Sequence, residues 1–362
     1  MKLSRITLLA TLLLTAPAAA QLQITPPAAI PSPSTEKQKP KEAAKEKPKT
    51  APHTITRKKE AAPAPKPSAS PSPAATVIPA PPTDNSNVDL VFGAYQRGQY
   101  KTAFDLAGAR AKTGDAKAMT MLGELYSNAM GIRRDYAKAV EWYKRASDAG
   151  DREAMFALAM MRIAGRGGPV DKGEAVKLMA SAAKLGEPKA AYNLALLYLD
   201  GQTLPQDVKR SAELLRQAAD AGLPEAQYAL ATFYKEGTGV PKDLDKAVRL
   251  LQAASLADNV DAEVEYAIAL FNGTGTPQSK PAAVALLRKA SRQGSAIAQN
   301  RLAWVLINGM GATADKVEGF KWHLVAKTAG KGDPELDKQL ADLPADDRAK
   351  AEAAAKKWLG SK

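Results

Sequence analysis

Residues 222–257 read GLPEAQYALATFYKEGTGVPKDLDKAVRLLQAASLA, and this 36-residue stretch is the unit from which the fold is built. Its first part places alanine and large apolar residues at the spacing of an amphipathic helix. A Gly-Thr-Gly turn follows at residues 237–239, and the residues after it return to the helical pattern. The stretch therefore predicts two short helices joined by a glycine-rich turn.

The unit recurs along the chain with the same period and without an insertion. A glycine, replaced once by aspartate, opens each unit, and alanines recur at the positions of Ala226 and Ala254. One helical hairpin cannot bury its apolar faces alone, but stacked hairpins can, so a period of this length indicates a solenoid. The opening residues are Gly114, Gly150, Gly186, Gly222, Asp258, Gly294 and Gly330.

Three kinds of residue at fixed positions explain how such a unit packs. The alanines allow close approach of the helices, and large apolar residues at the positions of Leu230 and Leu250 fill the remaining space. An aspartate recurs at the position of Asp243 and is expected to cap the second helix. The opening glycine suits the left-handed conformation that ends a helix, and Asp258 tolerates that conformation better than most residues. The expected fold class is all-α: a right-handed α-solenoid of 36-residue helical hairpins.

This pattern resembles Sel1-like repeats, which are tetratricopeptide-like, and the chain looks like an exported bacterial protein of that kind. The resemblance covers residues 114–330 and is most specific at NLALLY (193–198) and QYALATFY (227–234). Two turns depart from it, because Ala129 replaces a glycine and Thr203 stands where the second turn glycine is expected. These turns are expected to differ in shape while the register is kept.

The predicted domain boundaries follow from changes in composition. Residues 1–20 have a basic start, a short apolar run and a small-residue cleavage site before Gln21, which predicts a secretory signal peptide. An uncleaved N-terminal anchor is the alternative. Residues 21–87 carry 15 of the 25 prolines and predict a disordered Pro/Ala/Lys-rich linker. The remaining segments are a tetratricopeptide-like hairpin at 88–113, six Sel1-like repeats at 114–329 and C-terminal capping helices at 330–362.

The charge of the chain and its predicted export limit the classes of partner that it can meet. The chain has a formal net charge of +13 and no cysteine, and no apolar run after residue 20 is long enough to span a membrane. We expect a periplasmic protein, with secretion as the alternative, and no transmembrane segment in the mature chain. The basic linker suits contact with a cell wall or another anionic surface, unless it is only a solvated spacer. No nucleic-acid partner is expected of an exported protein in which aromatic and basic residues do not interleave.

Residues that carry chemistry are scarce. His53 lies in the linker, and His323 occupies a position where the other repeats have packing residues. No cluster of histidine, cysteine and carboxylate has the spacing of a metal site. The sequence predicts no enzyme activity, no catalytic residue, no metal and no cofactor.

The predicted partner-binding residues lie on the first helix of each hairpin. In tetratricopeptide-like arrays these helices line a concave groove, and here their outward positions are more apolar and aromatic than a solvated face needs. The alternative is that many of these side chains pack against neighbouring hairpins. The predicted residues of the concave face are Phe156, Met160, Tyr192, Leu196, Tyr228, Ile268 and Trp304.

The resemblance implies a scaffold, adaptor or regulator, serving envelope signalling or complex assembly, that binds a protein or peptide in this groove. One alternative is a cell-wall-associated hydrolase or penicillin-binding activity, which the lack of cysteine and of a nucleophile constellation disfavours. Another is a peptidoglycan-associated envelope organiser, held there by the linker.

Overall fold

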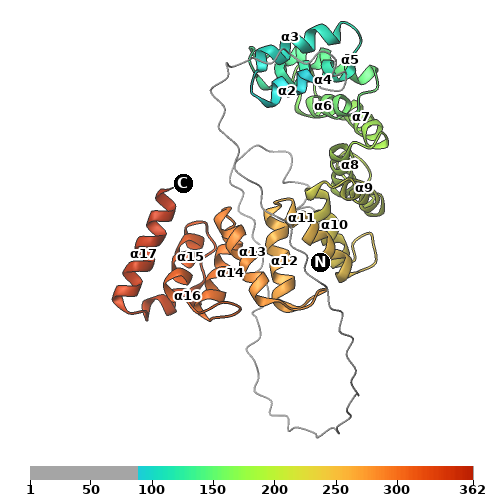
Figure 1. Cartoon of the computed structure of the whole chain (residues 1–362). Helices are drawn as coiled ribbons and strands as arrows, with labels where there is room; N and C mark the ends of the chain where they lie inside the picture. The colour runs from blue at the N-terminus through green and yellow to red at the C-terminus, as the bar shows by residue number, and fades with distance from the viewer. Residues whose placement is uncertain (1–88, 362) are drawn as a thin grey trace, which may run out of the picture. The chain divides into compact units, whose positions relative to one another are not determined.

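The computed structural model describes residues 89–361, and every regular element within them is an α-helix. The predicted signal peptide and the linker lie outside these described residues. The helices succeed one another as hairpins along the chain (Figure 1). In the part of the chain described, no helix is long and apolar enough to cross a bilayer.

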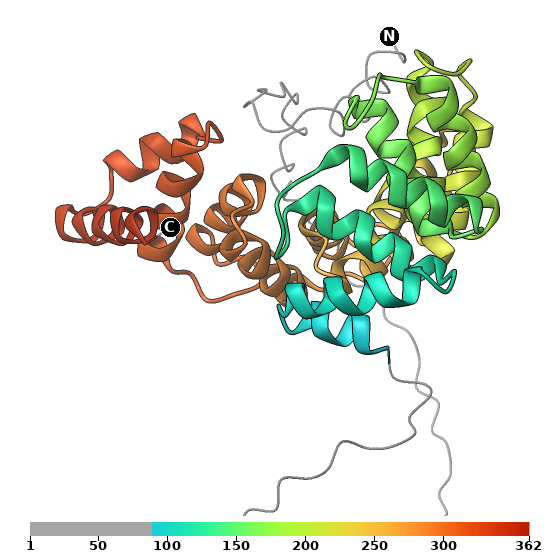
Figure 2. The same cartoon turned by 90° about the horizontal axis from the view of Figure 1, so that it is seen from above.

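Six hairpins of nearly constant length form the centre of the array, and the view in Figure 2 shows them stacked one after another. The prediction of an all-α solenoid is confirmed. The hairpins are α4 (Ala116–Asn128) with α5 (Tyr136–Asp148), α6 (Arg152–Ala164) with α7 (Lys172–Lys184), α8 (Pro188–Asp200) with α9 (Val208–Asp220), α10 (Pro224–Glu236) with α11 (Leu244–Leu256), α12 (Val260–Asn272) with α13 (Lys280–Arg292), and α14 (Ala296–Ile307) with α15 (Lys316–Thr328).

Further helices stand at both ends of the array. The hairpin of α2 (Leu90–Gln96) and α3 (Tyr100–Ala111) precedes it and packs on α4. After it come α16 (Pro334–Ala341) and α17 (Ala345–Gly360), and α17 lies along α15. The terminal hairpins thereby cover apolar faces that no further repeat would bury.

Polar side chains fix where the helices begin. Asp243 accepts a hydrogen bond from the Lys246 backbone N–H at 2.9 Å, and this capping is confirmed at the equivalent aspartates of four other repeats. Most first helices are capped as well, which the sequence pattern did not indicate. Asp151, for example, accepts from the Ala154 N–H at 2.8 Å.

The turns between units hold the left-handed conformation that the sequence predicts. Gly222 has a φ of 85°, and Asp258, which replaces glycine at the equivalent point, has a φ of 60°. In the turn inside the first hairpin, Ala129 likewise takes a φ of 59° at the end of α4. Among residues 89–361, only these two non-glycine residues have positive φ, so Thr203 does not adopt the conformation of the glycine it replaces. Its turn therefore differs in shape, as expected, while α8 and α9 keep the register.

The second turn glycine is required by a contact between units. A Cβ on Gly275 would lie 2.5 Å from the backbone oxygen of Leu244, the first residue of the preceding unit's second helix. Gly239 is equally close to Val208 one unit earlier, at 2.6 Å. The turn of one hairpin therefore rests directly on the backbone of the hairpin before it.

The core runs between the two helices of each unit and on into the next unit. The alanines that recur near the end of each second helix, such as Ala182 and Ala254, are completely buried, and so is Leu302 on the first helix of the last repeat. Small side chains on both helices let the backbones approach, and the leucines fill the space that remains. The stability of the array therefore depends on packing between neighbouring hairpins.

Ala129→Gly should stabilise the protein by about 1 kcal/mol, because glycine adopts the left-handed conformation without the steric cost that alanine has there. Urea unfolding followed by circular dichroism measures the change. Asp258→Gly is the matched control. It relieves less strain, because aspartate tolerates the left-handed conformation better than alanine, and it removes the 2.6 Å ion pair between Asp258 and Lys289, so it should stabilise less. A larger gain at Asp258 than at Ala129 would contradict this explanation.

Candidate partner-binding face

The seven residues predicted for the concave face all lie on first helices. Phe156 and Met160 are on α6, Leu196 accompanies Tyr192 on α8, and the other three lie one on each of α10, α12 and α14. Leu196 is buried, with 6% of its surface exposed, whereas the rest are half-buried.

The half-buried residues divide their surface between the core and solvent. Phe156, Met160, Tyr192 and Tyr228 pack against a core that runs from the second repeat into the fifth. Ile268 and Trp304 pack against the core of the C-terminal repeats. The first-helix residues therefore contribute to packing between hairpins and also offer apolar surface to a partner. We call the exposed side of α8, α10 and α12 the first-helix face.

Trp304 has a structural partner within the chain. Its indole Nε1–H donates a hydrogen bond of 2.9 Å to Asp333 Oδ2, and Asp333 also caps the start of α16. Trp304 thereby joins the last repeat to the C-terminal helices. Its polar edge is already used, so any partner would contact only the rest of its ring.

Carboxylates lie near Tyr192 and Tyr228 on the first-helix face. Burial and the nearby charge of Glu225 raise the pKa of Tyr192 to about 12. Burial raises the pKa of Tyr228 as well, and the negative charges of Glu265, Asp261 and Glu236 add to the increase. These acidic residues were not predicted as part of the site, although acids that recur on successive first helices are visible in the sequence.

Titration with alkali, followed by phenolate absorbance, should reveal tyrosines that ionise late. Tyr95, Tyr143 and Tyr192 have pKa values raised to about 12, with burial as the largest cause, so they should ionise above the ordinary value near 10. Because the pKa of the folded state is raised, their contribution to stability is complete below pH 10 and is lost as pH rises through 12. Tyr192→Phe should remove one late-titrating group. An unchanged late phase in this variant would show that Tyr192 is solvated.

His323 is a packing residue, as the sequence predicts. Its ring is fully buried, and Nε2 lies 2.8 Å from Asp337 Oδ1 on α16. The hydrogen bonds of Asp337 with Lys327 and His323 lower the pKa of that carboxyl group. In the part of the chain that the structure describes, no group of three or more histidine, cysteine or acidic residues could hold a metal ion.

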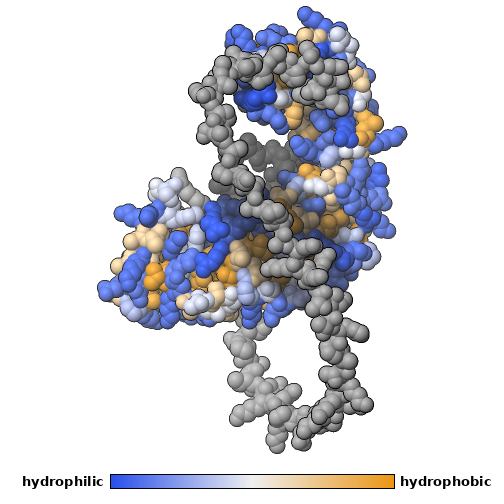
Figure 3. All heavy atoms as spheres, viewed as in Figure 1, coloured by the Kyte–Doolittle hydropathy of each residue, from blue (hydrophilic) through white to orange (hydrophobic). Residues whose placement is uncertain are grey.

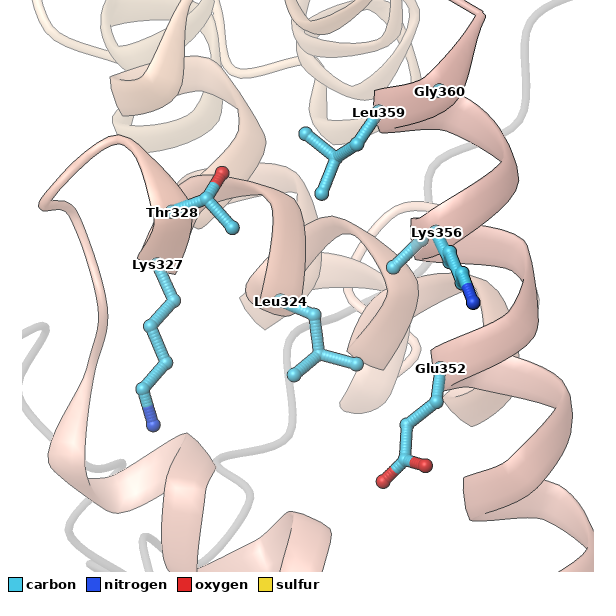
Figure 4. A pocket seen from close by; sticks show the side chains of 8 residues that line it. Leu324, Lys327, Thr328, Glu352, Lys356, Leu359 and Gly360 are labelled. Carbon is cyan, nitrogen blue, oxygen red and sulfur yellow. The ribbon is translucent and has the colours of Figure 1, made fainter.

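An open groove of about 750 Å³ lies between α15 and α17 (Figure 4). The side chains of Leu324 and Leu359 enter it from the two helices, and Lys327, Glu352 and Lys356 stand at its rim. The surface in Figure 3 is hydrophilic over most of the visible face, with hydrophobic residues in separate patches.

Comparison with known proteins identifies the repeat. The Sel1 repeat family model matches six consecutive segments, 116–151, 152–187, 188–223, 224–259, 260–295 and 296–331. Each segment begins two residues after the corresponding opening residue. No curated protein matches the chain.

The fold is also that of a solved structure. A Sel1 repeat protein from Oxalobacter formigenes is 26% identical with a TM-score of 0.60, and the match covers 67% of this chain and all of that protein. A protective antigen of uropathogenic Escherichia coli with an SLR fold is 22% identical with a TM-score of 0.48, covering 72% of this chain and 64% of the antigen. Sel1 repeats form a general scaffold for protein–protein interaction and are typically non-catalytic. With six consecutive repeats over more than half of its length, the chain belongs to the Sel1 repeat family.

Proposed function

We propose that this protein is a periplasmic scaffold or adaptor that holds a protein or peptide partner on its first-helix face, for envelope signalling or complex assembly. The observation that carries the proposal is the placement of Tyr192, Tyr228 and Ile268 on successive first helices, each half-buried. Rings held by packing on one side lose little conformational entropy when a partner covers the other side.

Export is supported by the basic start, apolar run and small-residue site of residues 1–20. The proposal therefore expects the mature chain to begin at Gln21 and to be released with the periplasmic fraction. N-terminal sequencing of the protein purified from that fraction checks the cleavage. A chain that keeps Met1 and remains with the membrane would support the uncleaved anchor instead.

Photo-crosslinking tests the binding face directly. A photoreactive residue placed at Tyr228 in the full chain should capture a partner in cells, and mass spectrometry should identify it. The control position is Leu256 at the end of α11, which is 79% exposed and lies outside the first-helix face. Capture at residue 256 but not at residue 228 would place the binding surface elsewhere.

Ring and hydroxyl contributions can then be separated. Tyr192→Ala with Tyr228→Ala should weaken binding of the captured partner by roughly tenfold or more, because aromatic residues dominate interface energies. The matched pair Tyr192→Phe with Tyr228→Phe keeps the packing surface and should retain most of the affinity. Equal loss in both pairs would assign binding to the hydroxyl groups rather than the rings.

A further inference from the structure

In the third to fifth repeats, acidic residues lie mostly on the first helix of each hairpin and basic residues mostly on the second. The first helices α8, α10 and α12 carry six carboxylates and two lysines, whereas the second helices α9, α11 and α13 carry nine basic residues and three carboxylates. The whole chain is basic, with a net charge of +13. The first-helix face is therefore acidic within a protein that is positive elsewhere. The charged residues of these three first helices are Lys189, Asp200, Glu225, Lys235, Glu236, Asp261, Glu263 and Glu265. Glu263 is buried and pairs with Lys289 of α13 at 2.7 Å, so it does not belong to the face.

Carboxylates of the first helices lie near the half-buried tyrosines Tyr192 and Tyr228. Glu225 acts on Tyr192 electrostatically, and Tyr228 is influenced by Glu236, Asp261 and Glu265 together. Their negative charges therefore converge on the rings that the proposed function places at the interface.

Cations of the chain itself compensate few of these charges. Lys235 Nζ lies 2.9 Å from Glu265 Oε2. Within residues 89–361 the structure gives Glu225, Glu236 and Asp261 no ion pair, although all three are exposed. Partial desolvation and the charge of Glu265 raise the pKa of Asp261. A cation brought by a partner would relieve this repulsion.

We propose that the first-helix face binds an extended segment of a partner protein that is rich in lysine and arginine, an inference that rests on the proposed function. Carboxylates on successive first helices pair with successive basic side chains, and the faces of Tyr192 and Tyr228 accept the same cations by cation–π contact. The aliphatic stems of lysine and arginine cover the apolar surface between them. An acidic or purely apolar segment fits this combination less well.

A fluorescent oligolysine peptide tests the charge preference on the full mature chain by anisotropy at low ionic strength. Asp261→Asn with Glu265→Gln should weaken its binding about tenfold, which corresponds to about 1.4 kcal/mol. The control pair, Glu213→Gln with Asp245→Asn, also removes two exposed carboxylates but does so from α9 and α11. It should change the affinity less than twofold, and all variants should keep the thermal unfolding midpoint of the parent.

Asp261→Asn alone leaves the pair between Lys235 and Glu265 in place, so weaker binding by this variant would assign the effect to the unpaired carboxylate. Equal weakening by the control pair, or binding of an oligoglutamate as tight as that of oligolysine, would overturn the inference. The proposed function survives that result if the partner is still captured at residue 228. If nothing is captured there, the proposed function fails whatever the peptide does.

Discussion

Gly275→Ala should lower the free energy of unfolding by about 2–4 kcal/mol, since it combines backbone strain with a steric clash. The residue has a φ of 67°, and its new Cβ would lie 2.5 Å from the Leu244 oxygen and 2.8 Å from the Leu244 carbonyl carbon. Both of these atoms belong to the backbone of α11 and cannot move aside like the end of a flexible side chain. The fourth and fifth hairpins would have to separate.

Gly222→Ala is the matched control for this substitution. Gly222 also has a positive φ, of 85°, but no atom lies within 4 Å of the Cβ that would be added. The free energy of unfolding should therefore fall by only about 1 kcal/mol, the cost of placing alanine in the left-handed conformation. Denaturant unfolding of both variants measures the difference. Equal losses would show that the left-handed conformation, and not the contact with α11, is the reason for the second turn glycine.

Trp322→Ala should lower the free energy of unfolding by about 3–5 kcal/mol, the usual range for removing a buried tryptophan side chain. The Trp322 ring is 3% exposed, packs edge-to-face on Trp358 of α17 at 5.1 Å between centroids, and donates from Nε1 to Glu318 at 3.3 Å. Because α17 covers this ring, the substitution should also loosen the C-terminal helix. Hydrogen exchange of the α17 amides would show that loosening.

Trp142 provides a control at the equivalent position of the first repeat. Its ring is half-buried and has Arg145 over its face at 4.5 Å, with no covering helix comparable to α17. Trp142→Ala should therefore cost less, about 1–2 kcal/mol. If the two substitutions cost the same, the C-terminal helix contributes little to the burial of Trp322.

The repeat period made most of the fold predictable, because glycine, alanine and aspartate each have a local physical reason to recur. Asp243 caps its helix through a local hydrogen bond, and a small residue such as Ala254 is typical of a close contact between helices. The residue type alone therefore indicates the local structure at these positions. The contact that requires Gly275 was not predictable in this way. The contact joins the turn after α12 to the start of α11, about 30 residues earlier in the chain, and only the stacking of the hairpins brings the two together.

The binding face was less accessible to sequence reasoning than the fold. Helical spacing places Tyr192, Leu196 and Trp304 on one side of their helices, but it does not say how far the next hairpin covers them. The structure buries Leu196 and engages Trp304 with Asp333, while Tyr192 keeps part of its surface. The charge of the face depends on Asp261 and Glu265 acting with Tyr228 from another hairpin, a relation that only the stacking creates.

The resting of each turn on the hairpin before it also limits how such an array can change in length. A single inserted residue would carry the second turn glycine away from the backbone it touches, and would shift the capping aspartate with it. Gain or loss of a whole unit keeps every such contact, because the new neighbours meet through the same pair of surfaces. Arrays of this kind can therefore grow or shrink by complete repeats, and the binding face would lengthen or shorten in equal steps.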